Sequence, residues 1–382
     1  MSETNLNIQM VDLKSQYMKI KPQVDKAIND VLSSTQFING EHVKSFQNEL
    51  AAYLGVKHVI TCANGTDALQ ISMMALGLKP GDEIITPSFT YIATTEVIAL
   101  LGLKPVFVDC DPENFNISVE EVEKVITEKT KAIVPVHLFG QSSDMKSIMN
   151  LAKKHNLFVI EDNAQAIGSD YLGFNKPQKT GTIGNIGCTS FFPSKNLGCF
   201  GDGGAMMTND DELAEKIRMI ANHGQSKRYY HDIIGCNSRL DNIQAAVLRI
   251  KLKKLDQYIL NRQKAANYYD KNLKDLDQLK IPSRNIDSNH VFHQYTIKLD
   301  DNIVRDDLIQ YLAKKNIPAM VYYPVPAHLQ KMFSKIPNTY GDMKVTNWLS
   351  SRVFSLPMHT ELSTLQQDYI TENLFKYLKI NK

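Results

Sequence analysis

The sequence lacks several features that would assign a protein to a class at once. Its five cysteines, Cys62, Cys110, Cys188, Cys199 and Cys236, form no C-x-x-C pair, and no histidine lies near them at zinc-finger spacing. The odd number and the scattered positions argue against a disulfide framework and indicate a reducing compartment. We therefore expect no metal site and a cytoplasmic protein.

Long apolar runs and an excess of one charge are also missing. No apolar stretch approaches the ~18 residues that a membrane-spanning helix needs, and the opening residues MSETNLNIQMVDLK do not have the profile of a signal peptide. The 43 basic and 41 acidic side chains leave a net charge of +2, which gives no electrostatic case for nucleic-acid binding. We expect neither a membrane nor a nucleic acid as a partner.

Nucleotide-binding loops are the third absence. There is no P-loop, and the glycines of GTIGNIG, residues 181–187, have the wrong spacing for a dinucleotide-binding motif. The place of this segment before a predicted strand suggests flexible turns instead.

What is present is the alternation of an α/β protein. Short apolar segments suited to buried strands alternate with helical patterns of ten or more residues, which predicts a mostly parallel sheet. The 382 residues exceed one average domain, and we expect a large domain over residues 1–245, with helices at its N-terminus, and a smaller α+β domain over 246–382. The seven strands expected in the large domain are His58–Cys62, Glu83–Pro87, Pro105–Asp109, Ala132–Val136, Leu157–Glu161, Cys188–Phe192 and Ala205–Thr208.

Helices are predicted between these strands and at both ends of the chain. The pattern from Val11 to Ser33 predicts one helix or two, broken near Pro22. A long helical pattern over Arg239–Leu273 links the two domains, and in the second domain Phe292–Leu299 and Met320–Tyr323 are predicted strands. The other predicted helices are Glu41–Leu54, Ala68–Leu76, Asp210–Ala221, Arg305–Ala313, Met343–Arg352 and Thr364–Leu378.

Residues 157–209 hold the groups that carry chemistry. Asp162 follows the apolar run LFVI, so its carboxylate falls at the C-terminal edge of a predicted strand, where open α/β sheets bind ligands. Ser190 lies in the predicted strand Cys188–Phe192, and Lys195 follows in a segment whose small residues and glycines favour a loop. A lysine amine is a nucleophile only when it has lost its proton, and its ordinary pKa is about 10.4. A lysine, an acid and a hydroxyl together are what pyridoxal phosphate needs in a protein.

Six motifs resemble, in order, those of the DegT/DnrJ/EryC1/StrS sugar aminotransferases. They are NGTDAL at 64–69, TPSFTYIATTE at 86–96, VFVDCDPENFNI at 106–117, EDNAQAIGSD at 161–170 with SFFPSKNLGCFGDGGA at 190–205, GCNSRLDNIQAA at 235–246 and YYPVPAHLQ at 322–330. The resemblance spans nearly the whole chain. It implies the aspartate aminotransferase fold, fold type I, with a mostly parallel seven-stranded sheet in the large domain, and pyridoxal 5'-phosphate as the cofactor.

The resemblance also implies roles for single residues. Lys195 is the implied covalent anchor and general acid and base, and Asp162 the acid partner of the ring nitrogen. Gln165 matches the residue that bonds the phenolic oxygen, and Phe89 an aromatic residue that stacks on the ring; a solvated cap and plain core packing are the respective alternatives. His137, at a predicted strand end, is either a histidine satisfied within the protein or a substrate contact.

The cofactor phosphate is expected at the start of the helix that follows NGTD. Free N–H groups at a helix start bind anions, so Gly65, Thr66 and Asp67 are candidate contacts, with Ser190 as a further one; an N-capped turn without a ligand is the alternative. Asn237 matches an asparagine that reaches into the neighbouring subunit's active site and binds the phosphate there. This implies a homodimer with shared active sites.

Substrate contacts are expected in two further segments. Arg239 is a candidate for binding a carboxylate or phosphate of the substrate, because its fork suits bidentate anion recognition; a surface charge balanced by Asp241 is the alternative. Tyr322, Tyr323 and His328 lie in a proline-rich loop that borders the sugar-nucleotide pocket in the family, and packing explains them equally well.

The implied reaction is a transamination in two half-reactions, with L-glutamate as donor and a nucleotide-linked keto-sugar as acceptor. Residues 223–231 and 323–330 most resemble enzymes that convert a dTDP-3-keto-6-deoxyhexose into a dTDP-3-amino-3,6-dideoxyhexose for glycan or O-antigen synthesis. A close alternative is amination at C3 of a UDP-linked 3-keto-hexuronic acid. Family dehydratases have histidine in place of the anchoring lysine, so Lys195 argues against that activity. A non-catalytic cofactor-binding or regulatory protein is the alternative from another class.

Overall fold

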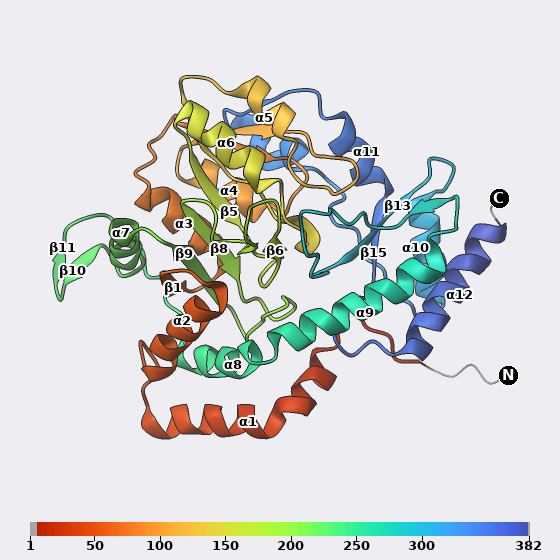
Figure 1. Ribbon diagram of the computed structural model, residues 1–382, viewed down its shortest axis with the longest axis horizontal. Helices are drawn as coiled ribbons and strands as arrows, with labels where there is room; N and C mark the ends of the chain where they lie inside the picture. Colours follow the sequence, from red (N-terminus) through yellow and green to blue (C-terminus); the bar gives the residue numbers. More distant parts are fainter. Residues whose placement is uncertain (1–5, 381–382) are drawn as a thin grey trace.

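The computed structural model describes residues 6–380 and places an eight-stranded sheet at the centre of this part of the chain (Figure 1). The strand order is β1-β9-β8-β5-β4-β2-β3-β14. Neighbours from β8 to β14 run parallel, whereas β9 pairs antiparallel with both β1 and β8. The bounds are β1 (His58–Cys62), β2 (Glu83–Pro87), β3 (Lys104–Val108), β4 (Thr130–Ile133), β5 (Phe158–Asp162), β8 (Ile186–Ser190), β9 (Gly204–Thr208) and β14 (Thr339–Tyr340).

The predicted α/β class is confirmed, with one difference in the number of strands. Each of the seven predicted strands overlaps an observed one, and β1 and β2 have the predicted bounds. The eighth, β14, comes from the second half of the chain and pairs with Val106 and Phe107 of β3. A strand of two residues has no apolar periodicity, so the sequence pattern did not indicate it.

Neighbouring residues of the strands point into different layers, as strand geometry requires. Ile84 and Ile85 of β2 lie in separate apolar clusters, and so do Met206 and Met207 of β9. One face of the sheet is covered by α3 (Gly65–Ala75), α4 (Ala93–Leu100) and α7 (Asp211–Ala221). The other is covered by α2 (Glu41–Leu54) and α8 (Asn242–Leu252) near β1, and by α5 (Val119–Val125) and α6 (Met145–His155) near β3 and β4.

The second half of the chain builds a small antiparallel sheet. β12 (Leu279–Lys280), β13 (Tyr295–Leu299) and β15 (Val353–Leu356) pair in that order, and α10 (Arg305–Lys314) and α12 (Thr364–Ile380) pack with them around one apolar cluster. Here α11 (Lys344–Arg352) leads into β15.

The predicted strand over residues 320–323 is wrong. Only Met320 pairs, in an isolated bridge with Ser355. Pro324 and Pro326 follow closely, and proline cannot donate to a strand ladder.

Two helices lead from the large sheet to the small one (Figure 1). The single helix predicted over residues 239–273 is wrong, because α8 begins at Asn242 and ends at Leu252, and α9 (Leu255–Leu273) begins after a break. The boundary expected between residues 245 and 246 falls inside α8. At the N-terminal end, α1 (Leu13–Ser34) is continuous across Pro22 and packs against α8.

Two short hairpins are also present, β6 (Asp170–Tyr171) with β7 (Gln178–Lys179) and β10 (Gln225–Lys227) with β11 (Tyr230–His231). Three short 3-10 helices, η1 (Leu138–Gly140), η2 (Ala327–Leu329) and η3 (Lys331–Lys335), complete the described elements. Across residues 6–380, no helix has the length and apolar character to cross a bilayer. The same residues contain no group of three or more His, Cys, Asp or Glu side chains placed to hold a metal ion.

Candidate active site

Asp162 ends β5 at the carboxyl edge of the sheet and is 6 % exposed. Its amide donates to the carbonyl of Pro135 at 2.9 Å, and its carbonyl accepts from the amide of His137 at 3.0 Å. The carboxylate accepts from Thr94 Oγ1 at 2.7 Å and from the Ala164 amide at 3.1 Å. Backbone and side chain are therefore both held, and a negative charge lies at the predicted sheet edge.

Lys195 lies in the loop between β8 and β9, where its amide donates to the carbonyl of Phe192 at 2.9 Å. Burial lowers the pKa of the Lys195 amine to about 8, and the negative charge of Asp162 opposes this shift. Among residues 6–380 the amine has no hydrogen-bond acceptor and no ion-pair partner. Since Asp162 acts on its pKa, the two charges lie close enough to interact, and an amine with a pKa lowered to about 8 can accept a proton close to neutral pH.

Gln165 connects the large sheet with the proline-rich loop. Its Oε1 accepts from the amide of Phe139 at 2.7 Å, and its Nε2 donates to the phenol of Tyr323 at 2.9 Å. Tyr322 is joined to Tyr323 by a cis peptide bond. Burial raises the pKa of both phenols, so both remain neutral and able to donate. The structure thus brings Gln165 and Tyr323, two of the predicted contacts, together.

The two rings that follow β2 occupy different environments. Phe89 has no exposed surface and packs against Phe115, Phe139 and Tyr323, with ring centroids 6.1, 6.4 and 6.2 Å away. Tyr91 is 57 % exposed, and its ring centroid lies 6.1 Å from that of Tyr323. Phe89 therefore presents no ring face to a ligand, contrary to the expected stacking role, and Tyr91 is the exposed ring that the sequence reasoning missed.

Gly65, at the start of α3, meets Ser190, at the end of β8. A Cβ atom on Gly65 would lie 2.7 Å from the Cβ of Ser190, so this close approach requires glycine. The first amides of a helix have no acceptor within it, and Thr66 and Ser190 add hydroxyls at partly exposed positions. Backbone donors, hydroxyls and the positive end of an 11-residue helix together suit an anion.

Asp67 organises this turn instead of facing a ligand. Its amide donates to the Asn64 side chain at 2.8 Å, and its carboxylate accepts from the Ser238 hydroxyl at 2.6 Å. The expected phosphate contact through Asp67 does not match this arrangement, because both groups are engaged within the chain. Ser238, which the sequence reasoning missed, fixes its neighbour Asn237 beside α3. Asn237 is exposed, and within residues 6–380 neither its side chain nor that of Arg239 has a hydrogen-bond or ion-pair partner.

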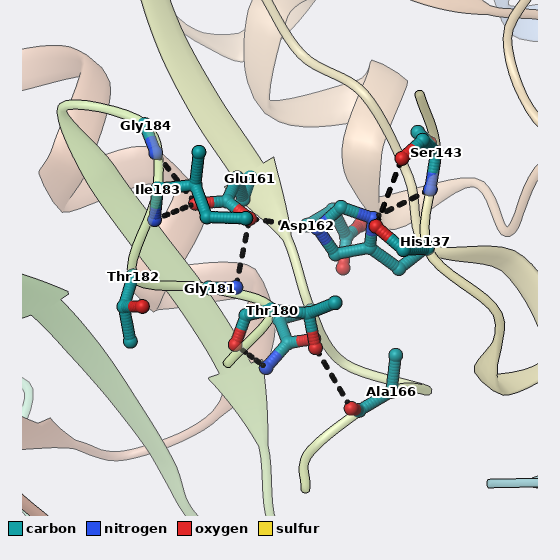
Figure 2. A network of polar contacts seen from close by, with 12 residues as sticks. His137, Ser143, Glu161, Asp162, Ala166, Thr180, Gly181, Thr182, Ile183 and Gly184 are labelled. Atoms are coloured by element: carbon teal, nitrogen blue, oxygen red, sulfur yellow. Dashed lines mark hydrogen bonds and ion pairs between the residues drawn. The ribbon is translucent and has the colours of Figure 1, made fainter. Parts of the chain in front are cut away.

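Both histidines considered as substrate contacts are engaged inside the protein. His328 is 7 % exposed, its Nδ1 lies 2.7 Å from the Ser88 hydroxyl, and burial lowers its pKa. It fastens the proline-rich loop to the segment after β2, so packing explains it. His137 has no exposed surface and lies 2.8 Å from Glu161 through Nε2 (Figure 2). It is the satisfied histidine of the two alternatives.

Comparison with known proteins gives the same family along nearly the whole chain. A model of the DegT/DnrJ/EryC1/StrS aminotransferase family matches residues 18–375. A pleiotropic regulatory protein of Geobacillus stearothermophilus is 45 % identical over 98 % of this chain and 99 % of its own. A UDP-2-acetamido-2-deoxy-3-oxo-D-glucuronate aminotransferase of Pseudomonas aeruginosa is 45 % identical over 94 % of this chain and 96 % of its own. A dTDP-3-amino-3,6-dideoxy-alpha-D-galactopyranose transaminase of Aneurinibacillus thermoaerophilus is 40 % identical over 97 % of this chain and 99 % of its own.

Solved structures share the fold. DesV of S. venezuelae, in complex with a ketimine intermediate, has a TM-score of 0.93 and 37 % identity over 98 % of this chain and 99 % of that chain. NtdA from Bacillus subtilis, with bound cofactor PMP, has a TM-score of 0.87 and 31 % identity over 97 % of this chain and 83 % of that chain. The aspartate aminotransferase-like α/β fold predicted from the motifs is therefore confirmed.

Proposed function

The chain belongs to the DegT/DnrJ/EryC1/StrS aminotransferase family, and we propose that it moves an amino group from L-glutamate to C3 of a nucleotide-linked keto-sugar. As a member of this family it is a pyridoxal-phosphate-dependent aminotransferase. One observation carries the proposal: burial lowers the pKa of the Lys195 amine to about 8, and the charge of Asp162 acts on the same amine. That pair supplies a nucleophile, a proton acceptor and a counter-charge within one site.

The residues of the site fit the cofactor. Lys195 would hold it covalently, Asp162 would pair with its ring nitrogen, and its phosphate would lie against the amides of Gly65 and Thr66 and the hydroxyl of Ser190. The close approach of Gly65 to Ser190 leaves no room for a side chain between the helix start and the strand end. When bound, the cofactor supplies an electron sink for negative charge on the reacting carbon.

The chain's own groups orient the cofactor and move protons. Lys195 Nζ would take a proton from Cα of glutamate and, in the second half-reaction, deliver one to C3 of the keto-sugar. Thr94 holds the Asp162 carboxylate in place, and Tyr91, the exposed ring beside Tyr323, would stack on the cofactor ring.

A UDP-linked 3-keto-hexuronic acid is the acceptor that we favour. The Pseudomonas relative is named for such a substrate and is the more similar of the two sugar-nucleotide relatives. Arg239 adds a physical reason, because its guanidinium has no ion-pair partner within residues 6–380 and its fork suits a sugar carboxylate. The second candidate is the dTDP-3-keto-6-deoxyhexose suggested by the loop motifs, which the Aneurinibacillus relative supports.

Offering both nucleotide sugars with glutamate and identifying the products by NMR separates the two candidates. With the uronate as substrate, Arg239→Ala should lower kcat/KM about tenfold or more, since a hydrogen bond to a charged group contributes about 1.5–3 kcal/mol. The same variant should change kcat/KM for the uncharged deoxyhexose less than about threefold. Amination of the dTDP sugar alone would select the second candidate, and amination at C4 would contradict both.

The relative named as a regulatory protein motivates a separate test of catalysis. The visible absorbance of the cofactor-loaded protein should shift when glutamate is added and return when the keto-sugar follows. A band that stays unchanged with glutamate would favour binding without transamination.

A homodimer with shared active sites is part of the proposal. Asn237 lies on the surface, and its side chain is free within residues 6–380, as expected of a residue that binds the phosphate in a second copy. The amino sugar made by this cytoplasmic enzyme would enter glycan or O-antigen synthesis.

A further inference from the structure

Glu161 immediately precedes Asp162 in β5, and alternation along the strand directs their side chains to opposite faces. Glu161 has no exposed surface. Burying a carboxylate is costly unless hydrogen bonds replace those that it made to water. The groups that donate to Glu161 therefore identify what this charge holds together.

Four donors surround the Glu161 carboxylate (Figure 2). Its Oε1 accepts from the amides of Ile183 and Gly184 at 2.7 and 2.6 Å. Its Oε2 accepts from the amide of Gly181 at 2.8 Å and lies 2.8 Å from Nε2 of His137. Three donors come from one turn, residues 181–184, and the fourth comes from the segment after β4.

His137 links this carboxylate to the backbone of the active site. Its Nδ1 accepts from the amide of Ser143 at 3.1 Å, which assigns the ring hydrogen to Nε2, facing Glu161. Its own amide donates to the carbonyl of Asp162. Asp162 is therefore held from two directions, through the residue that precedes it and through the amide of His137.

Residues 181–184 form a turn, as predicted, and the glycines in and after it approach other parts of the chain closely. A Cβ on Gly187 would lie 2.0 Å from the carbonyl oxygen of Gly181, and a Cβ on Gly184 would lie 2.7 Å from that of Val159. Gly181 has a φ of +82°, which residues other than glycine rarely adopt. The turn leads directly into β8, the strand that ends at Ser190.

We propose that Glu161 is a positioning residue for the cofactor, acting through His137 and the 181–184 turn to set the places of Asp162 and Ser190. The inference rests on the proposed function, which assigns the ring nitrogen and the phosphate to those two residues. The two strands pair directly in the sheet, and Glu161 adds a second connection, because it lies on the strand that carries the acid and holds the turn that leads into the strand that carries the phosphate contact.

Glutamine is the informative substitution because it keeps the shape of the side chain and removes the charge. Its NH2 group would face either the N–H groups of the turn or Nε2–H of His137, so donors would oppose donors. His137 cannot relieve this by changing tautomer, since the amide of Ser143 already faces its Nδ1.

The experiment compares Glu161→Gln with Asp109→Asn as a matched control. Asp109 is also buried, at 7 % exposed, and its carboxylate accepts from the amides of Val345 and Thr346, but it contacts neither Asp162 nor the 181–184 turn. Both variants should lower the Tm of the apoenzyme. Only Glu161→Gln should raise the Kd for pyridoxal 5'-phosphate, by about tenfold or more in a fluorescence titration, and lower kcat while KM for glutamate changes less than about twofold.

The outcomes separate this inference from the function on which it rests. If the Tm of Glu161→Gln falls as that of Asp109→Asn does, but its Kd for pyridoxal 5'-phosphate equals that of the wild type, the inference is overturned and the proposed function stands. If the wild type itself binds no pyridoxal 5'-phosphate, the function is contradicted. If Glu161→Gln does not fold, His137→Phe takes its place, because it keeps a ring and removes both the donor to Glu161 and the acceptor of the Ser143 amide. It should raise the cofactor Kd, and an unchanged Kd would overturn the inference.

Discussion

The side-chain amide of Gln165 donates a hydrogen bond of 2.9 Å to the phenol of Tyr323, across 158 positions of sequence. Gln165 follows the strand that ends at Asp162, and Tyr323 belongs to the proline-rich loop of the second half of the chain. This bond joins the two parts of the protein beside the candidate catalytic groups.

Replacing Tyr323 by phenylalanine tests that bond. The ring should keep its packing against Phe89 and Tyr91. Because Gln165 Nε2 loses its acceptor, we expect the free energy of unfolding to fall by about 1 kcal/mol. The loop should also be held less firmly at the site, so kcat/KM for the keto-sugar should fall more than that for glutamate. Urea unfolding measures the free energy of unfolding, and steady-state kinetics measure kcat/KM for each substrate. If the variant matches the wild type in all of these, the bond has no role.

Lys195→Ala should abolish transamination, with a loss of at least about 10³-fold, because both the covalent anchor and the proton carrier are removed. The variant should also lack the visible absorbance of the loaded enzyme. Lys216→Ala, at an exposed position of α7, is the control and should behave like the wild type. Turnover by purified Lys195→Ala would refute the mechanism.

Cofactor capture by the apoenzyme should depend on pH through Lys195. Only the neutral amine attacks the aldehyde, so the capture rate should rise with pH around a midpoint near 8, the value to which burial lowers the pKa. The charge of Asp162 raises that pKa, so Asp162→Asn should move the midpoint lower. Stopped-flow absorbance measures this, and a midpoint near the ordinary lysine value of about 10.4 would contradict it.

The same shift has a consequence for stability. Between the folded pKa near 8 and the ordinary lysine pKa of about 10.4, the unfolded chain binds more protons at Lys195 than the folded one. The free energy of unfolding of the apoenzyme should therefore rise with pH across this window, by an amount reduced where water reaches the amine. In Lys195→Met, the free energy of unfolding should lack this part of the increase with pH. If the free energy of unfolding depends on pH identically in the variant and the wild type, the pKa of Lys195 is not lowered.

Tyr91 and Phe89 should respond differently to substitution. Tyr91→Ala should raise the Kd for pyridoxal 5'-phosphate about tenfold with little change in the free energy of unfolding, because an exposed stacking surface is removed. Phe89→Leu should lower the free energy of unfolding by about 1 kcal/mol with little change in Kd, because its ring fills the core. A cofactor titration measures Kd, and urea unfolding measures the free energy of unfolding. If Phe89→Leu instead raises the Kd and Tyr91→Ala leaves it unchanged, Phe89 is the stacking residue.

Mixing two inactive variants tests the shared active site. Lys195→Ala and Asn237→Ala should each be impaired alone. In a mixed dimer, one site would combine an intact Lys195 from one chain with an intact Asn237 from the other, so activity should return after subunit exchange. No recovery, with mixed dimers demonstrated by tagged chains, would place both residues of a site in the same chain.

Much of the sheet and the centre of the site follow from local chemistry. Buried parallel strands are short apolar runs, so Glu83–Pro87 was predicted with its observed bounds. Asp162 and Lys195 were predicted together because a strand end and a glycine-rich loop are recognisable along the sequence, and in the structure the charge of Asp162 acts on the pKa of the Lys195 amine.

Contacts between distant side chains did not follow from the sequence. Ser238 reaches Asp67 across 171 positions, and no local pattern predicts such a pair. Phe89 and Tyr91 lie two positions apart with the same apolar character, and only packing decides which ring is buried. For His328, the resemblance suggested a ligand where the protein itself supplies the Ser88 hydroxyl.

The pairing of β14 with β3 affects how the chain acquires its fold during synthesis. Residues 339–340 cover the outer strand of a sheet whose other members all lie before residue 209. Until the ribosome has released that late segment, the nascent protein has an unpaired strand edge, which is a surface prone to aggregation. Completion of the large sheet must therefore wait for nearly the last tenth of translation.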